Sequence, residues 1–499
     1  MYISTRGGQD RVSAAEAIKA GIAADGGLFV PEFIPEVGKE LLAALLTMDY
    51  RQRAVTILRQ FLTDYTDAEL AACVQAAYTD KFDCLDIAPL KAVGNDNYIL
   101  ELWHGPTSAF KDMALQLLPQ LLSKALSKTN ESAEIVILVA TSGDTGKAAL
   151  EGFKDIAQTK MIVFFPQQGV SEIQRLQMVS QAGSNVSVVA VKGNFDDAQT
   201  GVKQIFNDSQ FNDQMAKQGF QLSSANSINW GRLVPQIVYY FSAYADMVRD
   251  GYLAMGQPVN FVVPTGNFGN ILAGYYAKLM GLPVHRLICA SNSNNVLTEF
   301  LRTGVYNRQR HFYKTLSPSM DILISSNLER LLYHITGGNT QQVQHWMNEL
   351  NHTGSYNVGA DYLAAIQEIF WAGWADDNET TAMMKTVYDR YQYVADPHTA
   401  VAWQISESYC QQTGDDTPRI IVSTASPFKF NDSVLKALNG ADNLADKTEF
   451  AMLRELAKIS GYPVPIALAA LEDAPVRHQL VCDIKDMKDV VKGILGVKK

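Results

Sequence analysis

The stretch AEIVILVATSGDTGKAALEGFK, from Ala133 to Lys154, reads as a strand, a glycine-rich turn and a helix. Its first part is a short apolar run rich in β-branched residues, and its last part continues as a helix. Further apolar runs of this kind, several of them followed by helical segments, are KMIVFFP, NVSVVAV, VNFVVP, HRLICAS and RIIVST. Near-continuous apolar strands that alternate with helices predict parallel sheets covered by helices on both faces.

The chain has room for more than one domain, because 499 residues exceed what a single hydrophobic core usually serves. The N-terminal part is mainly helical by its periodicity, and Ser13 and Glu16 have the spacing of a capping box. The region from about residue 300 to 395 is helical again. We expect a mainly helical N-terminal domain at 1–95, a small α/β domain at 131–222, and a large α/β domain formed by 96–130 and 223–499.

Composition argues against two classes of partner. Hydrophobic residues make up 47% and charged residues 19% of the chain, and the formal net charge is −10. Nucleic acid needs a basic face, so it is a poor match for this chain. No apolar run is long enough to cross a bilayer, and the N-terminus shows no apolar signal core. The five scattered cysteines form no CxxC pair, so we expect reduced thiols in a cytoplasmic protein.

Ligands of parallel α/β sheets bind beyond the carboxyl ends of the strands, so the turns at those ends are informative. The turn PTGNFGN, from Pro264 to Asn270, follows a strand and opens a helix. Gly266 and Gly269 let the backbone approach a ligand, and the free N–H groups of a helix start favour a phosphate. The alternative is a tight connection without a ligand, since the spacing does not match GxGxxG.

The turn TSGDTGK, from Thr141 to Lys147, is similar to a nucleotide P-loop but departs from it twice. Thr141 stands where the first glycine belongs, and Ala148 replaces the hydroxyl that would bind magnesium. The turn that remains is a hydroxyl-rich helix start. It suits a carboxylate, or it is an ordinary N-cap cluster.

A third polar turn, SSANSINWGRL, runs from Ser223 to Leu233. Its Arg232 either binds a phosphate through two N–H groups or is a solvated surface residue. A metal site is poorly supported, because His345 and His352 have no companion cysteine or acidic pattern. A serine hydrolase is unsupported as well, because the sequence has no G-x-S-x-G elbow.

Six motifs taken in order are more specific than any one of them. They are HGPTSAFKD, TSGDTG, NSINWGR, PTGNFGN, DPHTA (Asp396–Ala400) and STASPFKF (Ser423–Phe430). In this order they resemble the threonine synthases, and YISTRGG and ADGGLFVPE resemble the N-terminal segment of that family. The resemblance covers nearly the whole chain and is greatest to the longer bacterial and fungal type. It implies a fold-type II, tryptophan-synthase-β-like α/β enzyme that uses pyridoxal 5′-phosphate, with parallel twisted sheets in a large and a small domain.

The resemblance also implies a reaction. Threonine synthases convert O-phospho-L-homoserine and water into L-threonine and phosphate by γ-elimination and β-addition of water, the last step of threonine biosynthesis. Lys111 would form the Schiff base with the cofactor. A lysine nucleophile must lose its proton, and desolvation beside an apolar wall such as Phe110 lowers its pKa. The alternative for Lys111 is a helix-start lysine whose ammonium reaches solvent.

The matching motifs imply the residues that bind the cofactor. The glycine-rich loop would hold the cofactor phosphate through backbone donors. Thr424 would face the pyridine nitrogen, and a hydroxyl there makes the ring a milder electron sink than an aspartate would. Asp144 matches a position near the ring oxygen that is commonly an amide in relatives. The implied set is Lys111, Asp144, Gly266, Asn267, Phe268, Gly269, Asn270 and Thr424.

Two turns would bind the substrate. The residues that match the pocket for the substrate phosphate are Asn226, Ser227 and Arg232, and those placed to bind its carboxylate or phosphate are Thr141, Ser142 and Thr145. One departure from the family is Ser426, which stands where some relatives carry a histidine. His398 of the DPHTA motif has no role that the sequence explains.

Two other functions remain open. One is a different fold-type II enzyme, such as a serine or threonine dehydratase, whose substrate carries no phosphate. The other is a non-catalytic relative that binds only the cofactor or a protein partner. Lys111 and the two turns expected to bind phosphate, PTGNFGN and SSANSINWGRL, argue against it; we call these turns the anion loops. For the enzyme we expect a small-molecule substrate, no metal, no membrane or nucleic-acid partner, and a monomeric state.

Overall fold

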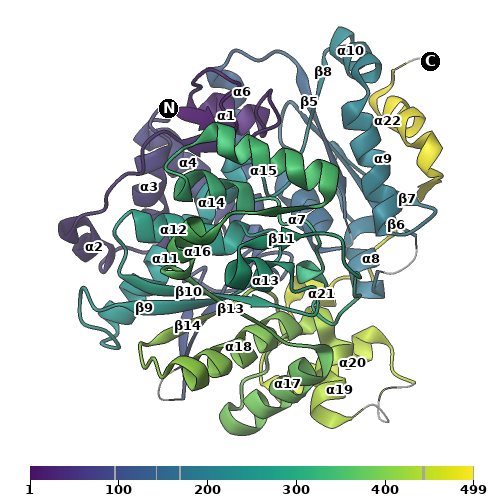
Figure 1. The fold of residues 1–499 in the computed structure, drawn as a ribbon. Coiled ribbons are helices and arrows are strands. Elements are labelled where there is room, and N and C mark those ends of the chain that lie inside the picture. The colour runs from purple at the N-terminus through teal and green to yellow at the C-terminus, as the bar shows by residue number, and fades with distance from the viewer. Residues whose placement is uncertain (95–96, 142, 168–169, 441–443, 445, 498–499) are drawn as a thin grey trace.

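The computed structural model describes residues 1–94, 97–141, 143–167, 170–440, 444 and 446–497. Two sheets form its frame (Figure 1), with the strand orders β13-β10-β9-β14-β4-β3 and β15-β7-β6-β5-β8. The larger sheet is built from β3 (Leu90–Val93), β4 (Asn97–Glu101), β9 (Val259–Pro264), β10 (Val284–Ser291), β13 (Phe370–Trp374) and β14 (Arg419–Ser423). The smaller sheet is built from β5 (Glu134–Ala140), β6 (Thr159–Pro166), β7 (Val186–Val191), β8 (Phe220–Ser223) and β15 (Leu480–Cys482).

The strand pairing confirms the predicted parallel sheets. Every neighbouring pair in both sheets is parallel except β3–β4, which is antiparallel. Alternate residues of the central strand β9 face opposite cores: Phe261 and Val263 face one core, whereas Val262 faces the other. A strand buried on both faces needs apolar residues at successive positions, which explains the near-continuous apolar runs.

Helices cover both faces of the larger sheet. On one face lie α11 (Trp230–Arg249) and α12 (Gly269–Leu279), and on the other lies α18 (Pro397–Thr413). The region from about residue 300 to 395, which was predicted to be helical, contains α13 (Val296–Thr303), α14 (Leu328–Ile335), α15 (Thr340–Thr353), α16 (Ala360–Gln367) and α17 (Asp377–Tyr391). This region also contributes β13 to the sheet edge.

The N-terminal part is mainly helical, as predicted, and Ser13 with Glu16 forms the expected capping box. Its helices are α1 (Ala14–Ala20), α2 (Lys39–Leu45), α3 (Tyr50–Phe61) and α4 (Asp67–Ala77), and its strand β2 (Phe29–Pro31) pairs with β1 (Tyr2–Ser4). These elements share one continuous core with α11 and α12. The rings of Tyr2 and Phe61 lie 5.3 and 5.5 Å from the ring of Trp230. The limit at residue 95 is therefore not a boundary between separate cores.

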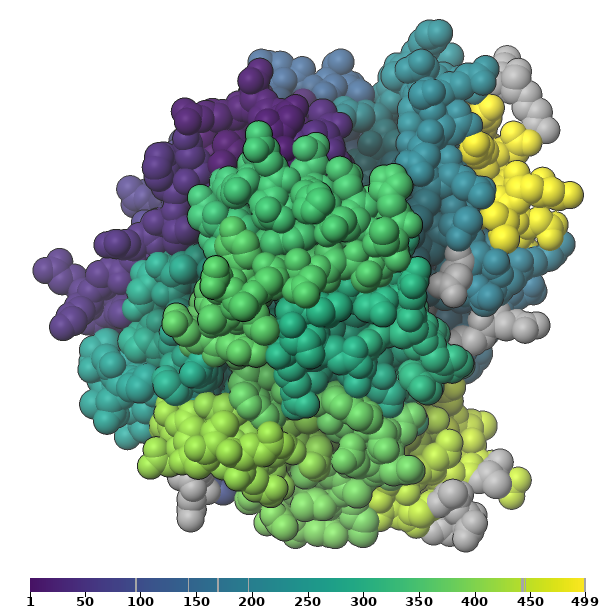
Figure 2. Space-filling view, in the orientation of Figure 1, coloured from purple at the N-terminus to yellow at the C-terminus, as the bar shows by residue number. Residues whose placement is uncertain are grey.

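The end of the chain joins the smaller sheet. Strand β15 pairs in parallel with β7, and α22 (Met487–Leu495) packs with it on a core that includes α9 (Phe195–Asn207). Figure 2 shows the C-terminal residues against this segment, on the side of the molecule that carries the smaller sheet. The domain division expected from the sequence assigned residues 223–499 to the large domain, whereas β15 pairs with a strand of the smaller sheet. A three-residue strand carries too little apolar pattern to reveal its sheet.

No helix among the described residues has both the length and the apolar character that a membrane span requires.

Two short helices approach each other closely at the junction of the two sheets. The helices α5 (Lys111–Leu115) and α7 (Asp144–Phe153) follow β4 and β5 respectively. A Cβ atom added to Gly152 would lie 1.9 Å from the backbone oxygen of Leu115, so only glycine permits this separation of the helices.

Replacement of Gly152 by alanine is expected to destabilise the chain, because α5 and α7 would have to move apart. We expect a loss of about 1–3 kcal/mol in the free energy of unfolding, measured as a lower melting temperature. The matched control is Gly493→Ala in α22, where no neighbouring atom lies within 4 Å of the added Cβ. That change should be neutral or stabilise by up to about 1 kcal/mol. Equal melting temperatures for the two variants would contradict the tight contact.

Candidate active site

The ends of strands from both sheets face one place. In the larger sheet β4, β14 and β9 are neighbours, and they lead to α5, to a 3₁₀ turn (Pro427–Phe430) and to α12. In the smaller sheet β5 leads to α7. A contact of 3.7 Å between Lys111 Nζ and Asp144 Oδ2 joins the two sheets at this place. The site therefore lies where ligands of parallel α/β sheets normally bind.

The backbone before Lys111 is fixed by two sets of hydrogen bonds. The N–H of Phe110 donates to the carbonyl of Thr424 at the end of β14, over 2.8 Å. The carboxylate of Asp112 accepts from both the N–H and the hydroxyl of Thr107, at 2.7 Å each. The carboxylate of the residue after Lys111 thus closes the turn at Thr107 that precedes the start of α5.

The amine of Lys111 has few polar neighbours. It donates to the hydroxyl of Ser319 over 3.0 Å, and its side chain is 12% exposed. The ring centroid of Phe110 lies 5.4 Å from Nζ, which confirms the apolar wall expected from the sequence. Lys111 is therefore a buried amine and not a lysine that reaches solvent.

Burial lowers the pKa of Lys111 to about 8. That value is the net result of several groups: the carboxylate of Asp144 opposes the shift, and the positive charges of Lys429 and Arg232 contribute to it. Desolvation and like charges both disfavour an ammonium, so this amine loses its proton far more readily than an ordinary lysine. That property is what a lysine nucleophile requires.

Lys429 is a site residue that the sequence did not single out. Its side chain is fully buried, and its Nζ lies 2.5 Å from Asp144 Oδ1 and 3.1 Å from the carbonyl oxygen of Thr107. Although burial favours the protonated carboxyl, the charges of Lys429 and Lys111 hold the pKa of Asp144 well below its usual range. The position lies within the STASPFKF motif, so a lysine just beyond a strand end was the available signal.

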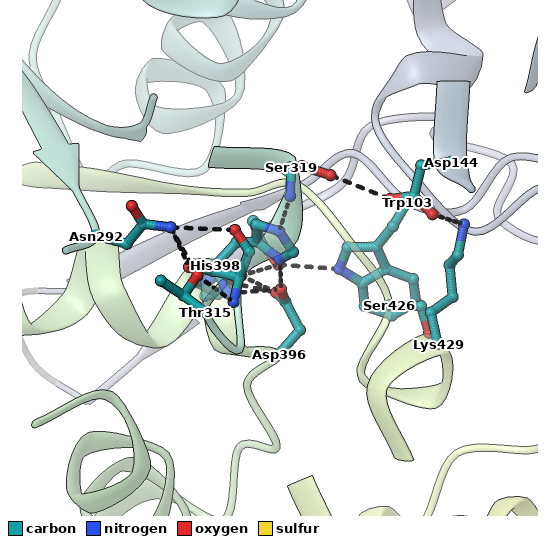
Figure 3. A network of polar contacts seen from close by, with 12 residues as sticks. Trp103, Asp144, Asn292, Thr315, Ser319, Asp396, His398, Ser426 and Lys429 are labelled. Carbon is teal, nitrogen blue, oxygen red and sulfur yellow. Dashed lines mark hydrogen bonds and ion pairs between the residues drawn. The ribbon is translucent and has the colours of Figure 1, made fainter. Parts of the chain in front are cut away.

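Ser319 links Lys111 to the DPHTA motif, and Figure 3 shows it between Asp144 and His398. Its hydroxyl accepts from Lys111 and donates to Asp144 Oδ2 at 3.3 Å. Its backbone N–H donates to Nε2 of the buried His398 at 3.2 Å, so the ring proton is on Nδ1, which donates to Asp396 Oδ1 at 2.8 Å. The motif therefore has a physical role: His398 holds the backbone of Ser319 beside Lys111.

Ser426 caps the turn that carries Lys429. Its hydroxyl accepts from the N–H of Phe428 at 3.4 Å, and its carbonyl accepts from the N–H of Lys429 at 3.1 Å. Its own N–H donates to the carbonyl of Ser108 at 3.0 Å, which ties this turn to the one before Lys111. Figure 3 shows Ser426 beside Lys429. The residue that departs from some relatives thus orders the backbone and makes no contact with Lys111.

The glycine-rich loop after β9 is shaped for close approach. Phe268 has a φ of 63°, in the left-handed region, and directly precedes α12. A Cβ on Gly266 would lie 2.6 Å from the carbonyl oxygen of Ser319, so this position requires glycine. The loop therefore lets a ligand approach the first N–H groups of α12 without hindrance from a side chain.

An unpartnered donor lies at the start of α12. Tyr239 and Tyr240 donate their hydroxyls to Asn270 Oδ1 at 2.6 and 2.9 Å, which fixes the amide orientation. The Nδ2 of Asn270 is then buried with no hydrogen-bond partner among the described residues. A buried amide donor beside a helix start fits the phosphate of pyridoxal phosphate. The side chain of Asn267 is exposed by contrast.

Arg232 is a buried cation without an anion. Its Nη1 donates to the carbonyl of Ala225 at 2.6 Å, and its Nε is buried with no partner among the described residues. No carboxylate among the described residues forms an ion pair with Arg232. Burial lowers the pKa of its guanidinium to about 10. A desolvated guanidinium in this state is suited to a phosphate group.

The other predicted substrate ligands have varied positions. Thr141 Oγ1 accepts from the N–H groups of Gly143 and Gly146 at 3.0 and 2.9 Å, so it orders the turn before α7. Thr145 is half-buried in the first turn of α7, and Ser142 lies outside the described residues. Their roles as substrate ligands stay predictions.

The remaining predicted positions are less engaged. Asn226 is exposed, and Ser227 is half-buried with its carbonyl held by another side chain. Thr424 is 5% exposed, and its hydroxyl forms no hydrogen bond with the described residues. Thr424 therefore has a free hydroxyl at the end of β14, beside the backbone of Phe110.

The start of α14 braces both anion loops, which the sequence did not indicate. The N–H of Asn327 donates to the carbonyl of Asn267, and its Nδ2 donates to the carbonyl of Ser227, each at 3.1 Å. The fully buried Arg330 donates to the Asn327 side chain and to the carbonyl of Phe29 in β2. The N-terminal strand therefore supports the loops from behind.

Three family models match the chain. They are "Threonine synthase N terminus" at residues 1–78, "Pyridoxal-phosphate dependent enzyme" at residues 83–425 and "Threonine synthase, C-terminal" at residues 399–491. The second of these covers more than half of the chain and includes Lys111 and both anion loops.

Proteins with curated names and solved structures are similar over nearly the whole chain. The human protein named threonine synthase-like 1 is 40% identical over 98% of this chain, which spans 67% of that protein. Threonine synthase of Pseudomonas aeruginosa is 39% identical over 87% of this chain and 90% of its own length. The PLP-bound threonine synthase structure from Brucella melitensis is 36% identical with a TM-score of 0.88, covering 99% of both chains. The yeast threonine synthase structure is 34% identical with a TM-score of 0.89, covering 100% of this chain and 99% of its own.

Replacement of Lys111 by methionine is expected to stabilise the cofactor-free chain at pH 7. The pKa of Lys111 falls from 10.5 to about 8 because of burial, so folding disfavours its charged form. The corresponding penalty at pH 7 is on the order of 3 kcal/mol, and methionine removes it.

The pH dependence gives the sign of this effect. Between the two pKa values the unfolded chain binds more protons, so the stability of the wild type rises from about pH 8 to about pH 10. The advantage of Lys111→Met should therefore be full at pH 7 and disappear by about pH 10, in thermal unfolding measured across that range. Lys436→Met, which changes an exposed lysine, is the control and should show no such trend. A difference that did not vary with pH would contradict the lowered pKa.

Proposed function

This chain belongs to the threonine synthase family of pyridoxal-phosphate-dependent enzymes, and we propose that it converts O-phospho-L-homoserine and water into L-threonine and phosphate. The observation that carries the proposal is the buried, unpartnered guanidinium of Arg232, which lies near enough to Lys111 to lower the pKa of its amine. A substrate phosphate is the anion that this cation lacks. The substrate of a serine or threonine dehydratase has no phosphate, so it would leave Arg232 unpaired.

The residues present fit pyridoxal phosphate. The cofactor, when bound, delocalises negative charge that develops on the carbon beside the substrate amine. The helix start at Gly269 and the free amide N–H of Asn270 would hold its phosphate. The free hydroxyl of Thr424 would face its pyridine nitrogen, and Asp144 would lie near its ring oxygen. Lys111 supplies the amine that anchors it.

Lys111 would also carry the proton transfers. With a pKa of about 8, roughly a tenth of these amines are neutral at pH 7, whereas an ordinary lysine is almost fully charged. The freed amine would remove a proton from the α-carbon and then from the β-carbon of the substrate. The hydroxyl of Ser319, 3.0 Å from Nζ, holds the amine in one orientation between these steps.

Arg232 would act at the other end of the substrate. The bond from the γ-carbon to the phosphate oxygen breaks, and the charge that develops on the leaving phosphate is stabilised by the guanidinium. Because Arg232 is 3% exposed, little water screens this attraction. The γ-carbon would then take the proton removed from the β-carbon and become a methyl group. Water would add its hydroxyl at the β-carbon and leave its other proton with the released phosphate, and a proton would return to the α-carbon to give threonine.

We further propose that the enzyme is a cytoplasmic monomer that acts on a small molecule, without a nucleic-acid or membrane partner. Two observations support this environment. The net charge of −10 disfavours nucleic acid and anionic lipid surfaces. All five cysteines are free thiols, as is usual in a reducing compartment.

Release of phosphate from O-phospho-L-homoserine tests the proposed function. The full chain with pyridoxal phosphate should release phosphate and threonine in equal amounts. Lys111→Ala should release neither, because the amine that moves the protons is gone, whereas Lys436→Met should retain full activity. Faster deamination of unphosphorylated serine or threonine would favour the dehydratase, and cofactor binding without any turnover would favour a non-catalytic relative.

Arg232→Met is expected to lower kcat/KM for O-phospho-L-homoserine by about 100-fold or more, because it removes a buried charge partner of the phosphate. The absorbance of the bound cofactor should stay unchanged, since a different loop holds the cofactor phosphate. Arg249→Met is the matched control, because Arg249 lies on the same helix but is exposed. An unchanged kcat/KM would refute the phosphate role, and a loss of cofactor absorbance would place Arg232 in the cofactor site instead.

A further inference from the structure

One carboxylate is shared by two buried lysines. Asp144 Oδ1 lies 2.5 Å from Lys429 Nζ, and Asp144 Oδ2 lies 3.7 Å from Lys111 Nζ. The side chains of Asp144, Lys429 and Lys111 are 7%, 0% and 12% exposed. Figure 3 shows Lys429 on one side of Asp144 and Ser319 on the other. The shorter and more deeply buried contact is the one with Lys429.

Lys429 is held in place independently of Asp144. Its Nζ also donates to the carbonyl of Thr107, and its backbone is fixed by the turn that Ser426 caps. The carbonyl of Thr107 is in turn positioned by Asp112, which accepts from the N–H and hydroxyl of Thr107. The ammonium of Lys429 is therefore a fixed charge and not a mobile counterion.

A single carboxylate beside a reactive lysine would normally stabilise its ammonium form and so keep it protonated. The groups that face Lys111 are Asp144 on α7, Lys429 on the turn after β14 and Arg232 on α11. His398 on α18 also faces Asp144, and its Nε2 accepts from the backbone N–H of Ser319. Lys429 and Arg232 thus oppose the effect of Asp144 on Lys111, and the shorter contact of Asp144 is with Lys429.

We propose that Lys429 is a positioning residue that neutralises Asp144 and thereby allows Lys111 to lose its proton. The proposal rests on the proposed function, in which Lys111 is the reactive amine. It explains how this chain accommodates an acid beside the amine: Asp144 and Lys429 act together as a neutral pair. A purely structural ion pair would stabilise the fold without any effect on the protonation of Lys111.

The test measures the proton affinity of Lys111 without turnover. The full chain, prepared without cofactor, is reacted with 1-fluoro-2,4-dinitrobenzene at a series of pH values, and the modified Lys111 peptide is quantified by mass spectrometry. Only the neutral amine reacts, so the midpoint of the pH profile reports the pKa of Lys111. The wild type should have its midpoint near pH 8, because burial lowers the pKa of Lys111 to about 8.

Lys429→Met should raise the midpoint by about one pH unit or more, because the attraction of Asp144 is no longer offset. Asp144→Asn should lower it. The double variant Lys429→Met/Asp144→Asn should return to within about half a unit of the wild type, because both charges are gone. Lys91→Met is the control: Lys91 pairs with the buried Glu101 outside this group, and its loss should leave the midpoint unchanged.

An unchanged midpoint in a folded Lys429→Met variant would overturn the proposal. If this variant fails to fold because Asp144 is left unpaired, the midpoint of Asp144→Asn is compared with that of the double variant Lys429→Met/Asp144→Asn. Adding Lys429→Met to Asp144→Asn must raise the midpoint, and equal midpoints overturn the proposal. Because no substrate is used, a chain with the expected shifts but no phosphate release would refute the proposed function and leave this inference standing.

Discussion

The site depends on an amine that is buried before any substrate arrives. Desolvation disfavours the ammonium form of Lys111, whereas the neighbouring carboxylate of Asp144 favours it. The fold supplies Lys429 and Arg232 as opposing charges and leaves Arg232 without an anion. These features lower stability in the empty chain. Their persistence in a well-packed core is typical of functional sites, where the rest of the structure supports the strain.

The same constraint explains why the site is built between two sheets. Lys111 and Lys429 follow strands of the larger sheet, whereas Asp144 follows β5 of the smaller one. The relation of α5 to α7 therefore fixes the distance between amine and carboxylate. Gly152 permits the close approach of α5 and α7 because it has no side chain. A glycine thus affects the distance between Lys111 and Asp144, on which their electrostatic interaction depends.

Local patterns carried much of the fold and part of the site. The apolar runs predicted the parallel strands, and the glycine-rich and polar turns marked Gly266, Asn270 and Arg232, because strand periodicity and turn chemistry are local. The role of Lys111 was implied only by the resemblance to the threonine synthases. Ser319 and Lys429 were missed because their contacts join residues 208 and 322 positions apart. Periodicity also shows which face of a helix is buried but not its partner, which is why the core shared by the N-terminal helices was not foreseen.

The C-terminal segment shows how distant packing can act on the amine. The helix α20 (Glu449–Ser460) belongs to the core of the larger sheet. The carboxylate of Glu449 accepts hydrogen bonds from the N–H groups of Glu172 and Ile173 at the start of α8 (Glu172–Val179), which follows β6 of the smaller sheet. The chain then crosses to pair β15 with β7. These links resist separation of the sheets, which would admit water between Asp144 and Lys429. At about 4 Å two unit charges attract by about 4 kcal/mol near a protein surface but about 1 kcal/mol in water. A wetter site would thus weaken the neutral pair and raise the fraction of Lys111 that is protonated, so residues far from the amine can affect its protonation.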